Sequence, residues 1–185
     1  CGPTGVGVVN VTDLNNLQIV KVFEPIKYED EDLGSADGQA IDVEVVDDIA
    51  YFGYDSFGLI AYSMADLVEP VPAGVNPTEL FKKRNNGDVF YDYRPEFLGK
   101  FKLQEEEGFE DVDGGSVKMA YTQQDGNLFF YAAFGHYGVV KIDYTDPALP
   151  ILGDAVPTAS ECVDVEIANG RLYVGDHAGG LVLFK

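Results

Sequence analysis

Residues 41–59 (IDVEVVDDIAYFGYDSFGL) and residues 163–181 (VDVEIANGRLYVGDHAGGL) are two copies of one nineteen-residue pattern. They align without a gap and share seven identical positions, including an Asp-Val-Glu core and a Gly-Leu end. A pattern that returns along a chain indicates an array of small units that stack on one another. The architecture of one unit therefore predicts the fold of the whole chain.

One unit is predicted to be a series of short strands. Residues 41–45 alternate apolar and acidic side chains, which is typical of a strand with one buried face. Residues 49–54 are rich in aromatic and branched side chains and predict a second strand, and residues 59–64 predict a third. The unit ends in a tail that is clearest at residues 138–150, where Thr-Asp-Pro predicts a turn.

The tail recurs along the chain, so that glycines at positions 5, 58, 138 and 180 mark four copies. The spacings between these glycines are 53, 80 and 42 residues, and the spacing of 80 would be one blade plus an insertion. A spacing of about 40–45 residues with four short strands is typical of a β-propeller blade. We expect a fourth strand near residues 98–99 and 152–153; for the first of these, residues 71–75 are an alternative. The chain is thus predicted to contain thirteen strands in groups of two, four, four and three.

These features resemble the LVIVD-repeat family of β-propellers. The matching residues are Ala50-Tyr51, Gly58-Leu59, Tyr131, Tyr173 and the stretches 138–150 and 179–183. The resemblance implies an all-β propeller of four-stranded antiparallel blades, from a family with few assigned activities. Residues 1–185 would form one partial propeller: the end of a blade in 1–27, blades in 40–103 and 116–156, and the start of another in 162–185. Residues 71–95 would be a short helical insertion.

A closed propeller needs roughly four to eight blades, which is more than this chain contains. We therefore expect that the chain is either a fragment of a longer propeller or one part of a ring that other copies or another protein complete. Both alternatives are open.

The composition is strongly acidic, with 32 acidic and 12 basic residues and a net charge of −20. Nucleic acid and anionic membrane surfaces would be repelled and are not expected as partners. No apolar run approaches the length of a transmembrane helix. The acidity fits an exported protein in an extracellular, periplasmic or cell-surface location, and it fits calcium binding. Cys1 is either a candidate for lipidation or a truncation point.

The two histidines of the chain, His136 and His177, are expected in the same turn of successive units. Together with Asp176 and Asp55 they form a candidate site for a divalent cation, because imidazole and carboxylate groups suit several such ions. The alternative is two unrelated turn histidines. The acidic stretches 28–37 and 104–113 are expected on the same face of the molecule. The sequence indicates no other cofactor.

Two further features concern the assembly of the fold. Glu44, Lys118 and Glu166 are expected at matching places in three successive units, as an acid–base–acid row that locks neighbouring blades together. In the insertion, Asn76, Pro77 and a glycine at position 87 predict a short helix with three basic residues near its end. This helix would be either a docking element or a basic cap on its own acidic protein.

The function expected from these features is a non-catalytic scaffold or binding module, which presents its acidic loop face and helical insertion to a protein or polymeric partner. Two alternatives are open: a metal-dependent propeller enzyme of the hydrolase or lactonase type that uses His136 and His177, and a propeller subunit of a larger redox or surface assembly. The chain has no Cys-x-x-Cys-His or Gly-x-Ser-x-Gly motif, so no reaction is indicated by motif.

Overall fold

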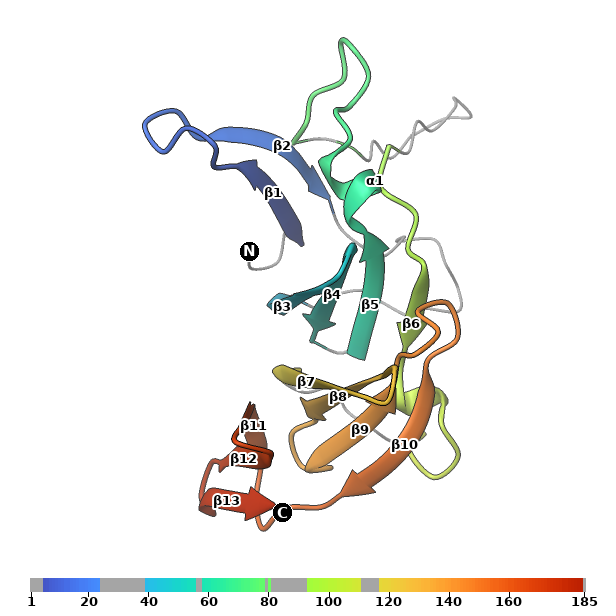
Figure 1. Ribbon diagram of the computed structural model, residues 1–185, viewed down its shortest axis with the longest axis vertical. Coiled ribbons are helices and arrows are strands. Elements are labelled where there is room, and N and C mark those ends of the chain that lie inside the picture. The colour runs from blue at the N-terminus through green and yellow to red at the C-terminus, as the bar shows by residue number, and fades with distance from the viewer. Residues whose placement is uncertain are drawn as a thin grey trace, which may run out of the picture.

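The computed structural model describes residues 5–23, 39–55, 58–78, 80, 93–110 and 117–184. These residues are mostly β-structure. They contain thirteen strands in four antiparallel sheets of two, four, four and three strands (Figure 1). The predicted grouping of the strands is therefore confirmed. No sheet in the described part of the chain closes on itself, and the ring of a propeller is not shown.

Within each sheet the strands pair with one another in chain order. The first sheet contains β1 (Val6–Asn10) and β2 (Gln18–Phe23). The second contains β3 (Ala40–Val46), β4 (Ile49–Tyr54), β5 (Gly58–Ser63) and β6 (Gly99–Phe101). The third contains β7 (Met119–Gln124), β8 (Asn127–Ala133), β9 (Val139–Asp143) and β10 (Ile151–Val156). The fourth contains β11 (Cys162–Ala168), β12 (Arg171–Asp176) and β13 (Gly180–Phe184).

Tight turns set the pairing of the first two strands in the third and fourth sheets. Asp125-Gly126 links β7 to β8 and Asn169-Gly170 links β11 to β12, and all four residues have positive φ angles. Two-residue turns of this kind match the twist of the strands they join. Asp and Asn followed by Gly are the residues that adopt such angles at the lowest cost.

The fourth strand of the second sheet is β6, at the first of the two places that the sequence left open. It pairs with β5, whereas residues 71–75 contain no strand. The α-helix of the described residues, α1 (Met64–Val68), directly follows β5 and so precedes the predicted insertion. Most of the predicted helix at 76–87 lies outside the described residues. The described part forms a turn, in which Asn76 Oδ1 accepts hydrogen bonds from the Thr78 backbone N–H and hydroxyl.

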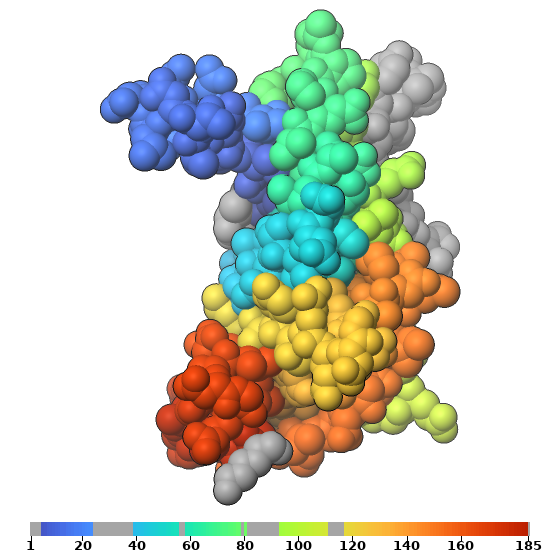
Figure 2. Space-filling model, in the orientation of Figure 1, coloured from blue at the N-terminus to red at the C-terminus, as the bar shows by residue number. Residues whose placement is uncertain are grey.

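The sheets stack face to face, and each interface contains its own apolar cluster. On β5, Ile60 and Tyr62 pack with the first sheet, whereas Leu59 packs with the third. On β13, Val182 and Phe184 pack with the third sheet. Figures 1 and 2 show the sheets following one another in chain order along the long axis, from blue to red. Successive side chains of a strand point to opposite faces of its sheet, so the second and third sheets each contribute side chains to two interfaces.

The predicted row of Glu44, Lys118 and Glu166 is wrong at its middle member. The residue of the third sheet that matches Glu44 and Glu166 is Ala120, two residues after Lys118. Glu44 pairs with Tyr51 and Glu166 with Tyr173, but the residue paired with the equivalent Tyr131 is Ala120. Between the matched tyrosine and the turn, each arm of the β7–β8 hairpin has two more residues than the corresponding arm of β3–β4, so alignment by sequence misplaces this strand. Lys118 instead matches Asp42, and its Nζ lies 3.6 Å from Asp42 Oδ1 in the neighbouring sheet.

Candidate functional site

The four predicted metal ligands lie at the ends of strands. Asp55 is half-buried after β4, and His136 and His177 are exposed in the turns that follow β8 and β12. Asp176 is the last residue of β12 and is buried. Its Oδ2 accepts a hydrogen bond of 3.0 Å from the Ser160 backbone N–H, which fixes the connection that leads into β11.

The described residues contain no group of three or more His, Cys, Asp or Glu side chains that could hold a metal ion. Asp176 Oδ1 is nevertheless buried, and no described residue gives it a hydrogen bond. The nearby thiol of Cys162 is also buried, and burial raises its pKa to about 12, so that it stays protonated at neutral pH. The metal site remains a prediction.

Loops between sheets and turns within sheets meet at one end of the molecule. Phe109, in the acidic stretch 104–113, packs its ring edge-on against Tyr137 in the β8–β9 turn, with 6.1 Å between the ring centres. In the same way, the backbone of Gly135 pairs with Cys162 at the start of β11. These contacts place the described part of the acidic stretch beside the turn that holds His136. Residues 28–37 and 111–113 lie outside the described residues.

The acidic stretch presents carboxylates to solvent at this end. Glu105, Glu107 and Glu110 are exposed. Glu105 ends a short 3-10 helix (Leu103–Glu105) that follows β6, and it lies within 3.5 Å of the ammonium groups of Lys100 and Lys102. A backbone hydrogen bond from Gly108 lowers the pKa of Glu110, so this side chain stays ionised. We call the exposed carboxylates of residues 105–110 the acidic loop face.

Carboxylates also gather where the first strands of successive sheets meet. Strand β7 lies between β3 and β11 (Figure 1). The pKa of Glu44 is raised, first by burial and then by the charges of Asp42 and Glu166. Asp42 itself accepts a 2.9 Å hydrogen bond from the Met119 backbone N–H across the interface. This cluster thus combines a contact between sheets with unfavourable charge at Glu44.

A buried cation in the first sheet was missed in the sequence. Lys21 Nζ donates a 2.6 Å hydrogen bond to the carbonyl oxygen of Asp66 in α1, which ties the helix to β2. Burial lowers the pKa of Lys21, while the charges of Glu69 and Asp66 oppose that shift. The two-residue period of a strand could have indicated this burial. Lys21 lies two residues before Phe23, so both side chains are on the buried face of β2.

Lys21 also lines a polar pocket of about 280 Å³. The other lining residues are Asp66, Glu69, Tyr93, Arg94, Pro95 and Glu96. The carboxylates outnumber the cations in this pocket, so it has no simple preference for an anionic ligand.

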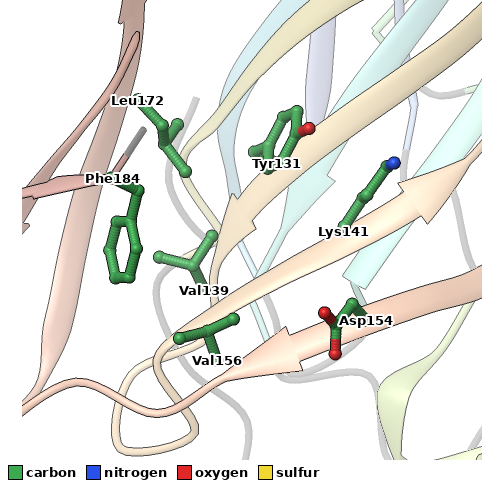
Figure 3. Close-up of a pocket in the computed structure, with 7 residues that line it drawn as sticks. All are labelled: Tyr131, Val139, Lys141, Asp154, Val156, Leu172 and Phe184. Atoms are coloured by element: carbon green, nitrogen blue, oxygen red, sulfur yellow. The ribbon is translucent and has the colours of Figure 1, made fainter.

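A second cavity, of about 200 Å³, opens between the third and fourth sheets. Its lining residues are Tyr131, Val139, Lys141, Asp154, Val156, Leu172 and Phe184 (Figure 3). Figure 3 shows an apolar end around Leu172, Phe184 and Val156, and a polar end where the Tyr131 hydroxyl, Lys141 and Asp154 lie. The lining of this cavity is thus partly apolar and partly polar, and the sequence contained no motif for it.

Comparisons with family models, with curated proteins and with solved structures gave no match to this chain. Function must therefore be inferred from the sheets, loops and cavities themselves.

Proposed function

We propose that this chain is a non-catalytic scaffold of LVIVD-type β-propeller repeats, which binds a protein or polymeric partner through the acidic loop face. The observation that carries this proposal is the repeated stacking of antiparallel sheets, which holds the acidic stretch at one end by the contact between Phe109 and Tyr137. Rigid repeats with loops gathered at one end are typical of binding scaffolds.

The charge of the acidic loop face defines the kind of partner. Exposed carboxylates attract a cationic surface, and the net charge of −20 extends that attraction over the molecule. We therefore propose a basic protein or polymer as the partner and not nucleic acid. We further propose an exported or cell-surface location. No helix among the described residues is long and apolar enough to cross a membrane.

The metal-dependent hydrolase or lactonase remains the alternative, with His136, His177, Asp176 and Asp55 as ligands. One observation favours it: the buried Asp176 Oδ1, which has no hydrogen-bond partner among the described residues. This buried oxygen supports a cation or a water molecule at Asp176. It gives no support to His136 and His177 as ligands, because both side chains are exposed.

Binding of a fluorescent decalysine peptide tests the scaffold proposal. We expect Glu107→Lys, on the acidic loop face, to weaken decalysine binding about threefold or more at low salt. The matched control is Asp48→Lys, an equal change of charge at an exposed residue in the β3–β4 turn, at the opposite end of the strands. Equal losses in the two variants would show diffuse charge attraction and would overturn the proposed face.

A further inference from the structure

The polar pocket beside Lys21 has walls from three segments of the chain. Strand β2 contributes Lys21, α1 and the residue that ends it contribute Asp66 and Glu69, and residues 93–96 lead toward β6. The structure describes every one of these residues. The volume of about 280 Å³ is just below the roughly 300 Å³ at which pockets for drug-sized ligands begin. The size of the pocket therefore suits a small metabolite.

Hydrogen bonds and buried leucines fix the walls of this pocket. The segment before β6 is held at one end by the Tyr93 N–H, which donates a 3.0 Å hydrogen bond to the Leu80 carbonyl oxygen. At its other end the Leu98 N–H donates a 2.8 Å hydrogen bond to the carbonyl oxygen of Ala61 in β5. On the opposite wall, Leu67 of α1 is buried in the same apolar cluster as Leu80. The walls therefore belong to the packed fold, and a ligand meets a preformed site.

Lys21 is the buried cation of the pocket, with only 4% of the residue exposed. Its ammonium group has three N–H donors, and the hydrogen bond to the Asp66 carbonyl oxygen uses one of them. Burial lowers the pKa of Lys21, and the charges of Glu69 and Asp66 oppose that shift and so favour the ammonium form. The other donors are suited to a ligand carboxylate, because hydrogen bonds between charged groups are about twice as strong as neutral ones.

The lining of the pocket contains charges of both signs. The cations are Lys21 and Arg94, and the carboxylates are Asp66, Glu69 and Glu96. A simple anion would be repelled by the carboxylates, and a simple cation would be repelled by the two basic groups. A neutral ligand would displace water from these charged groups without supplying a charged partner in its place. A ligand that carries both charges avoids each of these costs, and the one excess carboxylate favours a second positive charge on the ligand.

We propose that this pocket binds a free α-amino acid with a cationic side chain. The ligand carboxylate pairs with Lys21, and the two cationic groups of the ligand lie among the carboxylates of the pocket. This site is at the end of the strands that holds the β3–β4 turn, because the Met64 N–H at the start of α1 donates to the Asp48 carbonyl oxygen. The acidic loop face is at the opposite end, so either proposal can fail without the other.

Titration of the full chain with L-lysine, followed by backbone-amide NMR at constant ionic strength, tests the proposal. We expect L-lysine to shift the amide signals of Asp66, Glu69 and Glu96. Two matched compounds each lack one charge: 6-aminohexanoate has no α-ammonium group, and cadaverine has no carboxylate. L-Glutamate has an anionic side chain in place of the cationic one. Each of the three should bind at least about tenfold more weakly than L-lysine, because a charged group of the pocket then loses its partner or meets a like charge.

Two variants test the charged residues of the pocket. Lys21→Met removes the buried cation, keeps an unbranched side chain and should reduce L-lysine affinity at least about tenfold. Glu96→Gln, at an exposed residue, removes one carboxylate and should reduce that affinity about threefold while the fold is kept. Asp154→Asn is the matched control, because it removes one charge at an exposed residue of β10 in the third sheet.

Several results would overturn the proposal. L-Lysine could leave the amide signals of the pocket unchanged, or one of the three comparison compounds could bind as tightly as L-lysine. Wild-type affinity in Glu96→Gln would have the same meaning, and this variant decides the matter if Lys21→Met does not fold. An equal loss of affinity in Glu96→Gln and Asp154→Asn would show diffuse charge attraction instead of a site.

Discussion

Glu44 illustrates how neighbouring sheets change the chemistry of one residue. The strand pattern predicted a charged side chain beside a buried strand face, and Glu44 is half-buried. Burial, Asp42 and Glu166 all raise its pKa, so the folded protein holds this proton more tightly than the unfolded chain does. The stability that Glu44 contributes is therefore greatest below the ordinary carboxyl pKa of about 4.3 and declines as the pH rises through the raised value.

Replacement of Glu44 by Gln should relieve this unfavourable charge. We expect Glu44→Gln to raise the melting temperature at pH 7 by about 1–2 °C, because the charge is partly screened by solvent. The difference should shrink as the pH falls and disappear below about pH 4, where Glu44 is protonated in both states. Melting curves between pH 3.5 and 7.5 provide the measurement. The exposed Glu107→Gln variant is the control, and an equal gain there would contradict this account.

At the scale of strands, close backbone contact between sheets depends on glycine. Gly53 in β4 and Gly175 in β12 are equivalent, since each pairs with a leucine that follows the first glycine of the next strand. A Cβ atom on Gly53 would overlap with the carbonyl oxygen of Val117, which lies two residues before β7 of the third sheet. A Cβ atom on Gly175 would lie 3.4 Å from Asp164 Cβ, an ordinary contact. The same sequence position is therefore constrained in one sheet and open in another.

This contrast predicts different outcomes for one substitution. Gly53→Ala should lower the free energy of unfolding by about 1–3 kcal/mol, because the third sheet must move away. Gly175→Ala should be neutral or stabilise by less than about 1 kcal/mol, because alanine is preferred to glycine within a strand. Urea denaturation of the two variants and the wild type compares them directly. Equal losses of stability would mean that the second and third sheets do not pack as described.

At the scale of the whole molecule, the end sheets differ from the middle sheets in what covers them. Leu59 and Leu181 occupy equivalent positions on β5 and β13, yet Leu59 is 0% exposed and Leu181 is 73% exposed. The third sheet covers Leu59, whereas no described residue covers Leu181 to the same extent. The apolar repeat therefore contributes to the core only where another sheet follows.

Truncation of each leucine to alanine should show how much of its contribution to stability depends on a covering sheet. Leu59→Ala is expected to cost about 2–5 kcal/mol through the loss of buried surface and the cavity that it leaves. Leu181→Ala should change stability by less than about 0.5 kcal/mol, as is usual for exposed positions. Guanidinium denaturation followed by far-UV circular dichroism gives both values. A large loss for Leu181→Ala would show that its face is covered in solution.

Sequence periodicity by itself determined the β-class of this protein and its four groups of strands. These features depend on residues close together in the chain, where alternation and turn geometry act directly. The meeting of the acidic stretch with the β8–β9 turn was also predictable, because the direction of each strand places those loops at the same end.

Only the tertiary structure decided which side chains meet between sheets. It paired Lys118 with Asp42, because the β7–β8 hairpin has more residues between Tyr131 and its turn, and it buried Lys21 against α1. It left Asp55, His136 and His177 outside any described group of three metal ligands. Such contacts join residues that are distant in the chain, and their distances depend on how whole sheets pack, which no local pattern encodes.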